Sequence, residues 1–272
     1  MTTTDDYAAI VKRLRGWGFS GDEYPGCYGR SNGSGWTHGK PVLHTNHHYV
    51  CSMNPEQSYI DSLVANLAAG NTVNWFADVN GRFYLLGTGP MNHAGTGNSS
   101  VLNRAMNDQP NYSVANSAGD MSGNQTGSGT EAQHPGDDTP WPDSLLQIVF
   151  AINAAEFLQW GYSANRAINH YAWTNRKIDM SWLGGVAGDQ NGRSLVDNVQ
   201  RYMDGNGTGD DDVTDDEMDQ IAKKTVDLLL KRTVRGNRVD SATGKETVDD
   251  YPLSTVFGET YTNAGRAAYR SK

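Results

Sequence analysis

The histidines of this chain gather in two stretches that could together hold a metal ion. Three of the seven histidines fall within His44-Thr45-Asn46-His47-His48, and a second stretch runs from His170 to Asp179. Zinc is bound by imidazole nitrogen and carboxylate oxygen, and a catalytic zinc site has three protein ligands and one open position. The two stretches contain enough ligands for such a site. The same spacing is also typical of an exposed histidine cluster and a solvated basic segment.

The two cysteines, Cys27 and Cys51, offer a different chemistry. Two thiols without a CxxC pair predict no disulfide framework, and they could be free or form one bridge. Cys51 follows His47 by four residues, and a thiolate beside a histidine is the nucleophile of papain-like hydrolases. The start of a helix just after Cys51 could lower the pKa of its thiol. A cysteine hydrolase is therefore a second hypothesis.

The first histidine stretch is predicted to end a strand. Alternation over 41–47 puts Leu43, Thr45 and His47 on one face and His44 on the other, so His44 and His47 are not expected to bind one metal together. A helix is predicted next, with Asn54 as its cap, Pro55 and Gln57 in its first turn and Gly70 after its end. The strand and the helix would hold the histidines at a rigid position.

In the rest of the first two hundred residues, some segments have clear secondary-structure signals and others have weak ones. Residues 72–86 read as a β-hairpin around Asn80-Gly81, in which both turn residues are expected to accept a positive φ. Residues 87–140 are polar and read as one long loop. Helices are predicted over 5–15, 144–160 and 193–203. The buried face of the middle helix is expected to comprise Leu145, Ile148, Val149, Ile152, Ala155 and Leu158.

The composition predicts two parts of the chain and argues against two classes of partner. A Gly/Asp-rich linker predicts one domain over 1–205 and a small C-terminal module over 206–272, in which a helix should begin at Thr214. The net charge of -9 and the lack of basic clusters argue against nucleic acid and anionic membranes as partners. Neither a signal peptide nor a transmembrane segment is recognised, so we expect synthesis in a host cytoplasm and action elsewhere after release.

Four segments in the same order resemble the zinc N-acetylmuramoyl-L-alanine amidases of the peptidoglycan-recognition-protein type, most of all the endolysins of phages that infect actinobacteria. The resemblance covers about residues 40–182 and rests on short motifs. These are Asn46-His47-His48-Tyr49-Val50, the hairpin followed by Asn92-His93-Ala94-Gly95, Gly129-Thr130-Glu131-Ala132 followed by Pro140-Trp141-Pro142, and His170 to Asp179 with its Arg-Lys-x-Asp ending. The resemblance implies an α/β fold, a central mixed β-sheet flanked by helices.

The resemblance also implies a role for each matching residue. His47, His170 and Asp179 would bind Zn²⁺, with His44 and His48 as competing candidates for the first position. Glu131 would carry the proton of the attacking water, and Lys177 would stabilise the oxyanion. His93 would line the substrate groove. Some members carry a catalytic tyrosine where this chain has Val73 or Asn74, which favours Glu131 as the proton carrier.

The function implied is hydrolysis of the amide between N-acetylmuramic acid and L-alanine of bacterial peptidoglycan, in a phage endolysin. Two alternatives stay open: a recognition module without catalysis, and the wall-cutting domain of a phage tail protein. The module over 206–272 would bind the cell wall or drive homo-oligomerisation. A complete ligand set favours the enzyme.

Overall fold

The computed structural model divides the chain into two compact units, Met1–Gly209 and Asp210–Lys272. It describes residues 3–183, 187–205, 233–239 and 246–252. In the second unit, β9 (Thr233–Val239) and β10 (Glu246–Pro252) pair as an antiparallel ribbon. The helix predicted from Thr214 lies outside the described residues. Among the described residues, no helix is long and apolar enough to cross a membrane.

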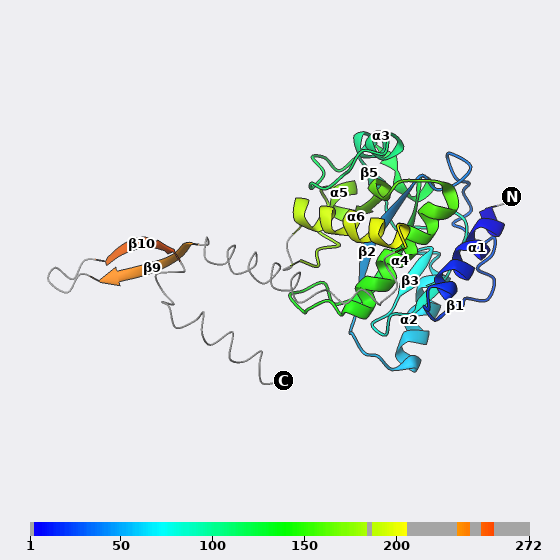
Figure 1. Cartoon of the computed structure of the whole chain (residues 1–272), viewed down its shortest axis with the longest axis horizontal. Coiled ribbons are helices and arrows are strands. Elements are labelled where there is room, and N and C mark those ends of the chain that lie inside the picture. The colour runs from blue at the N-terminus through cyan, green and yellow to red at the C-terminus, as the bar shows by residue number, and fades with distance from the viewer. Residues whose placement is uncertain (1–2, 184–186, 206–232, 240–245, 253–272) are drawn as a thin grey trace. The chain divides into compact units, whose positions relative to one another are not determined.

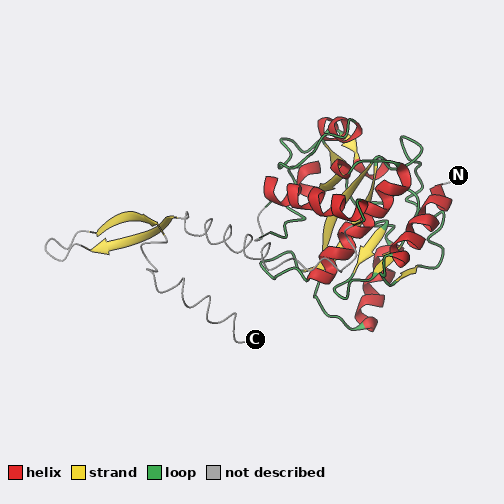
Figure 2. Cartoon of the chain, viewed as in Figure 1, coloured by secondary structure: helices red, strands yellow, loops and turns green. Residues whose placement is uncertain are grey.

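A six-stranded mixed sheet forms the framework of the first unit (Figure 1). Only β3 and β4 pair antiparallel, and the other neighbouring strands run parallel. The strand order is β1 (Gly21–Glu23), β4 (Phe83–Leu85), β3 (Trp75–Ala77), β7 (Gly127–His134), β2 (Leu43–Val50) and β8 (Ala167–Asn169). With its flanking helices (Figure 2), this sheet confirms the predicted α/β class.

Helices cover both faces of the sheet. On one face, α1 (Thr3–Gly16), α4 (Asp143–Trp160) and α6 (Asp189–Met203) bury an apolar core with β3, β4 and β7. On the other face, α2 (Gln57–Ala69) packs on β3 and β4, while α3 (Ser99–Met106) and α5 (His170–Trp173) pack beside β2 and β8. The apolar residues and terminal glycines of α1, α2, α4 and α6 explain why these helices were predicted, whereas α3 and α5 were not.

Two details of the helices differ from expectation. Asn54 does not cap α2, because the helix begins later, at Gln57, and the Asn54 side chain instead accepts a bond from the backbone N–H of Glu56. Leu158 of α4 is 38% exposed, whereas the other residues expected on that face are buried. The end of α4 is as predicted, since Gly161 takes a left-handed conformation there.

The predicted hairpin forms, but its turn is of another type. Trp75 pairs with Leu85 and Ala77 with Phe83, and the N–H of Asp78 donates to the carbonyl of Arg82, which leaves a three-residue loop. Of the two residues expected at positive φ, only Gly81 has it, at 76°. A three-residue loop needs one left-handed residue next to a bulge, which glycine supplies.

The expectation of one long loop over 87–140 is wrong. This segment contains α3, the short pair β5 (Thr96–Gly97) and β6 (Met121–Ser122), and the central strand β7. Every residue of β7 is buried, yet its sequence Gly-Ser-Gly-Thr-Glu-Ala-Gln-His has no apolar alternation. Small and polar residues are needed there because β7 lies between β3 and β2 and its side chains meet other polar groups. Hydrophobic periodicity therefore could not detect it.

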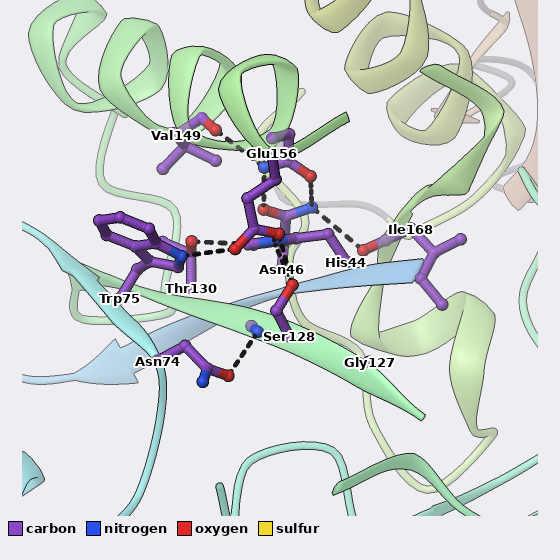
Figure 3. A network of polar contacts seen from close by, with 12 residues as sticks. His44, Asn46, Asn74, Trp75, Gly127, Ser128, Thr130, Val149, Glu156 and Ile168 are labelled. Carbon is purple, nitrogen blue, oxygen red and sulfur yellow. Dashed lines mark hydrogen bonds and ion pairs between the residues drawn. The ribbon is translucent and has the colours of Figure 1, made fainter. Parts of the chain in front are cut away.

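A buried polar network joins α4 to the central strands (Figure 3). Glu156 of α4 accepts a 2.6 Å bond from the indole of Trp75 and lies 2.8 Å from Nδ1 of His44. Ser128 also donates to Glu156, and His44 Nε2 lies 2.9 Å from the hydroxyl of Thr130. Because buried polar groups are stable only when paired, this network fixes how α4 sits on the sheet.

Candidate metal centre

Neighbouring strands bring three of the predicted site residues together on one face of the sheet. His47 of β2 lies in register beside Glu131 of β7, and Asn46 lies beside Asn169, the last residue of β8. His170 follows Asn169 directly, so it stands next to His47. Side chains alternate between the faces of a sheet, which places His47 and Glu131 on the face opposite α4.

A closed loop brings Asp179 to the same face of the sheet. The segment after His170 forms the short helix α5 and then a turn before it reaches Asp179. The backbone N–H of Tyr171 donates to the carbonyl of Asp179 at 2.6 Å, which returns the chain to its starting point. The loop is tied to its surroundings by Arg176, whose guanidinium donates to Thr96. The ten residues from His170 to Asp179 thus form a loop that brings Nδ1 of His170 to 2.9 Å from Oδ2 of Asp179.

The ligand atoms of His47, His170 and Asp179 converge. Nδ1 of His47 lies 2.8 Å from Nδ1 of His170, and Oδ2 of Asp179 lies 2.9 Å from His170 Nδ1 and 3.7 Å from His47 Nδ1. Zinc bonds of about 2.0–2.1 Å in a tetrahedral site separate ligand atoms by about 3.3 Å. The observed separations bracket this value. Two imidazole nitrogens and one carboxylate oxygen also form a donor set suited to zinc, so these residues fit the ion.

Burial and mutual contact keep these residues in the protonation state that binds metal. Burial, together with the nearby His170, lowers the pKa of His47 to about 3, so its ring is neutral. Burial opposes the ionisation of Asp179, but its contacts with His170 and His47 outweigh that effect and hold its pKa well below the usual range. Metal binding requires a neutral imidazole and an ionised carboxylate.

Glu131 faces the same cluster with an unused oxygen. Among the described residues, its buried Oε2 has no hydrogen-bond partner. Burial raises the pKa of Glu131 to about 8, the negative charge of Asp179 adds to that rise, and the positive charge of Lys177 opposes it. A buried oxygen without a partner points to a missing water or ligand. A pKa near neutrality suits a group that both accepts and donates a proton.

The other two predicted residues are placed differently. Lys177 is exposed and lies two residues before Asp179 in the loop. His93 was expected to line the groove, yet it is 8% exposed and both of its ring nitrogens are engaged. Its Nδ1 lies 3.1 Å from Nε2 of His47, and its Nε2 lies 3.0 Å from the carbonyl oxygen of Gly127. Sequence reasoning missed Gly127, because a backbone acceptor leaves no signal in the residue type.

The competing candidates lie away from the cluster. Both ring nitrogens of His44 are used by the Glu156 network on the opposite face. His48 is not among the converging ligand atoms, although it interacts electrostatically with Asp179 and His170, and its ring lies 6.3 Å from the rings of His134 and Trp141. Cys27 and Cys51 are both free, and burial raises the pKa of the Cys51 thiol to about 11. The helix expected to lower that pKa begins only at Gln57. These contacts disfavour the cysteine hydrolase.

Comparison with known proteins adds little to this geometry. No family model and no curated protein matches the sequence. The endolysin N-acetylmuramoyl-L-alanine amidase LysCS from Clostridium intestinale aligns at 14% identity over 48% of this chain and 69% of that one, with a TM-score of 0.30. A selenomethionine derivative of AmpD aligns at 19% identity over 62% and 92%, with a TM-score of 0.39.

A third solved structure is the hydrolase AmiA of Staphylococcus aureus in complex with its ligand. It aligns at 13% identity over 72% of this chain and 92% of that one, with a TM-score of 0.40. At these identities and TM-scores, none of the three similarities carries an argument about activity.

Proposed function

We propose that the first unit is a zinc-dependent N-acetylmuramoyl-L-alanine amidase that acts on bacterial peptidoglycan. The observation that carries the proposal is the convergence of His47, His170 and Asp179 beside the unpaired oxygen of Glu131. The motifs that resemble the peptidoglycan-recognition-type amidases contain these same four residues. No other group of three or more His, Cys, Asp or Glu side chains in the described part of the chain is arranged to hold a metal.

Each residue of the site has a distinct part in the proposed hydrolysis. His47, His170 and Asp179 hold the ion, which when bound supplies a Lewis acid for activating water and polarising a carbonyl. Glu131 accepts a proton from the attacking water and passes it to the departing amine. The carbon of the lactyl carbonyl gains a bond to the water oxygen and loses its bond to the nitrogen of L-alanine.

The raised pKa of Glu131 belongs to the protein without a cation. At neutral pH the buried carboxyl then retains its proton. Positive charge placed beside it favours the ionised form and lowers that pKa. Glu131 can therefore act as a base only in the metal-loaded protein. Lys177 is proposed to turn its ammonium toward the developing oxyanion, where a positioned donor stabilises the transition state.

Metal content and activity on purified cell walls test the proposal together. The wild type is expected to hold about one zinc per chain and to release new L-alanine amino termini, as a single site with three protein ligands and one open position predicts. Asp179→Ala should lose both properties, while Asp197→Ala, which changes a carboxylate on α6, should lose neither. Zinc without cleavage would favour a recognition module, and a wild type without zinc would remove the metal centre.

We further propose that the chain is a phage endolysin and that residues 206–272 form its wall-binding module. The proposal is supported by the resemblance of the motifs and by the division of the chain into two units. An endolysin acts at lysis, whereas a tail protein belongs to the particle. Purified virions should therefore lack the protein, and its presence in them would favour the tail-protein alternative.

A further inference from the structure

The two nitrogens of His47 face different partners, and only one arrangement of hydrogens satisfies both. Nδ1 faces His170 and Asp179, where a metal would be held, and Nε2 faces the ring of His93. A neutral imidazole carries one hydrogen, so a ligand that binds through Nδ1 must carry it on Nε2. Something must therefore accept a hydrogen from Nε2.

The partner of His93 decides the direction of this hydrogen bond. The carbonyl oxygen of Gly127 can only accept, so His93 Nε2 must be the donor at their 3.0 Å contact. The ring is buried, and its two nitrogens contact a carbonyl oxygen and another imidazole rather than a carboxylate that would stabilise a second hydrogen. Its Nδ1 is consequently a bare acceptor, 3.1 Å from Nε2 of His47.

The strand that carries Glu131 is shaped to receive His93. A Cβ on Gly129 would lie 2.5 Å from Nδ1 of His93, so any larger residue at that position would displace the ring. On the other side, the amide oxygen of Asn124 accepts bonds from the backbone N–H groups of Ala94 and Gly95, each at 2.9 Å. The His93 ring is therefore held at a fixed distance from His47.

We propose that His93 is a positioning residue that fixes His47 in the Nε2–H tautomer and so presents Nδ1 to the metal. The inference rests on the proposed metal centre. The hydrogen bonds run in one direction, from His47 to His93 and from His93 to the carbonyl of Gly127. Metal-binding histidines usually donate to a carboxylate or a carbonyl. Here a neutral histidine stands between the ligand and the carbonyl.

Nitrogen NMR of ¹⁵N-histidine-labelled full-length protein, prepared without metal, tests the hydrogen positions directly. Both His47 and His93 should carry their hydrogen on Nε2 and none on Nδ1. In His93→Leu, a measurable fraction of His47 should shift its hydrogen to Nδ1, where Asp179 can accept it. In His134→Leu, the control, His47 should keep its tautomer, because this buried histidine bonds the carbonyl of Thr139 instead.

Zinc affinity, measured by competition with a chelator, tests the consequence. Loss of such a hydrogen bond typically weakens metal binding by about 10–100-fold, and we expect this for His93→Leu. His93→Asn, which can place an amide oxygen near the position of Nδ1, should recover most of the affinity. Gly129→Ala should weaken binding while His93 remains. Should His93→Leu fail to fold, Gly129→Ala and the wild-type tautomers decide the question.

Two results would overturn the inference. One is a wild type in which His47 or His93 carries its hydrogen on Nδ1. The other is an unchanged zinc dissociation constant in folded His93→Leu or Gly129→Ala. A wild type that binds no zinc would instead defeat the proposed metal centre, and the tautomers of the metal-free protein would still decide the role of His93.

Discussion

The proposed role of Lys177 in catalysis can be tested without disturbing the metal ligands. It is exposed and is not among the converging ligand atoms. Lys177→Ala should therefore keep its zinc while losing turnover by about 10²–10³-fold, the usual effect of removing one oxyanion donor. The measurement is kcat on soluble peptidoglycan fragments together with zinc content. Lys12→Ala, an exposed lysine on α1, is the control, and a near-normal rate in Lys177→Ala would exclude this lysine from the reaction.

Glu131 should make the metal-free protein less stable as the pH rises. In the unfolded chain its pKa is near 4.5, and burial raises it to about 8 in the folded protein. Between pH 4.5 and about 8, the folded state keeps a proton on Glu131 that the unfolded state has released. The stabilisation from the protonated Glu131 is therefore complete below pH 4.5 and is lost as the pH rises toward 8. The loss is at most about 1.4 kcal/mol per pH unit.

Glu131→Gln does not titrate and should escape this loss. Urea unfolding at several pH values between about 4 and 8 should show that the free energy of unfolding of the variant rises relative to that of the wild type as the pH rises. Glu56→Gln, at an exposed position, should follow the wild type. A difference between Glu131→Gln and the wild type that stays constant across this range would contradict the raised pKa.

At the scale of elements, the junction of α4 with the sheet depends on Glu156. Glu156→Ala would leave Trp75, Ser128 and His44 without their shared partner. Removing one member of a buried pair typically costs about 3–5 kcal/mol, and we expect a loss of unfolding free energy of that size. Glu156→Gln should lose less, because its amide oxygen can still accept from Trp75.

Leu158→Ala is the matched control on the same helix. Leu158 is 38% exposed, so this change should cost less than about 1 kcal/mol. Denaturant unfolding monitored by tryptophan fluorescence gives all three values. Similar losses in Glu156→Ala and Leu158→Ala would show that the network contributes nothing beyond ordinary packing.

At the scale of the whole molecule, the two units should be separable in function. Removing the residues after Gly205 should weaken sedimentation with cell walls while cleavage of soluble fragments continues, since the proposed site lies entirely in the first unit. The full chain is the reference in both assays. Unchanged wall binding by the shortened chain would exclude a wall-binding role for residues 206–272.

The sequence by itself determined the features that local physics controls. Apolar residues at helical spacing predicted α1 and α6, the high apolar content of the segment predicted α4, and glycine predicted the end of α4, because these signals act over a few residues. The mixed α/β class came from the resemblance of the motifs, and the sheet confirms it. Asn80-Gly81 located the hairpin, although the turn differs in type.

Only the tertiary structure decided which histidine faces the ligand cluster and what supports it. The sequence placed His44 and His47 on opposite faces of a strand but could not tell which face would meet His170. That choice depends on the pairing of β2 with β7 and β8, and on Glu156 reaching His44 from α4. The hydrophobic pattern also missed β7, and residue type gave no sign of the contact between His93 and Gly127, because both depend on hydrogen bonds between distant segments.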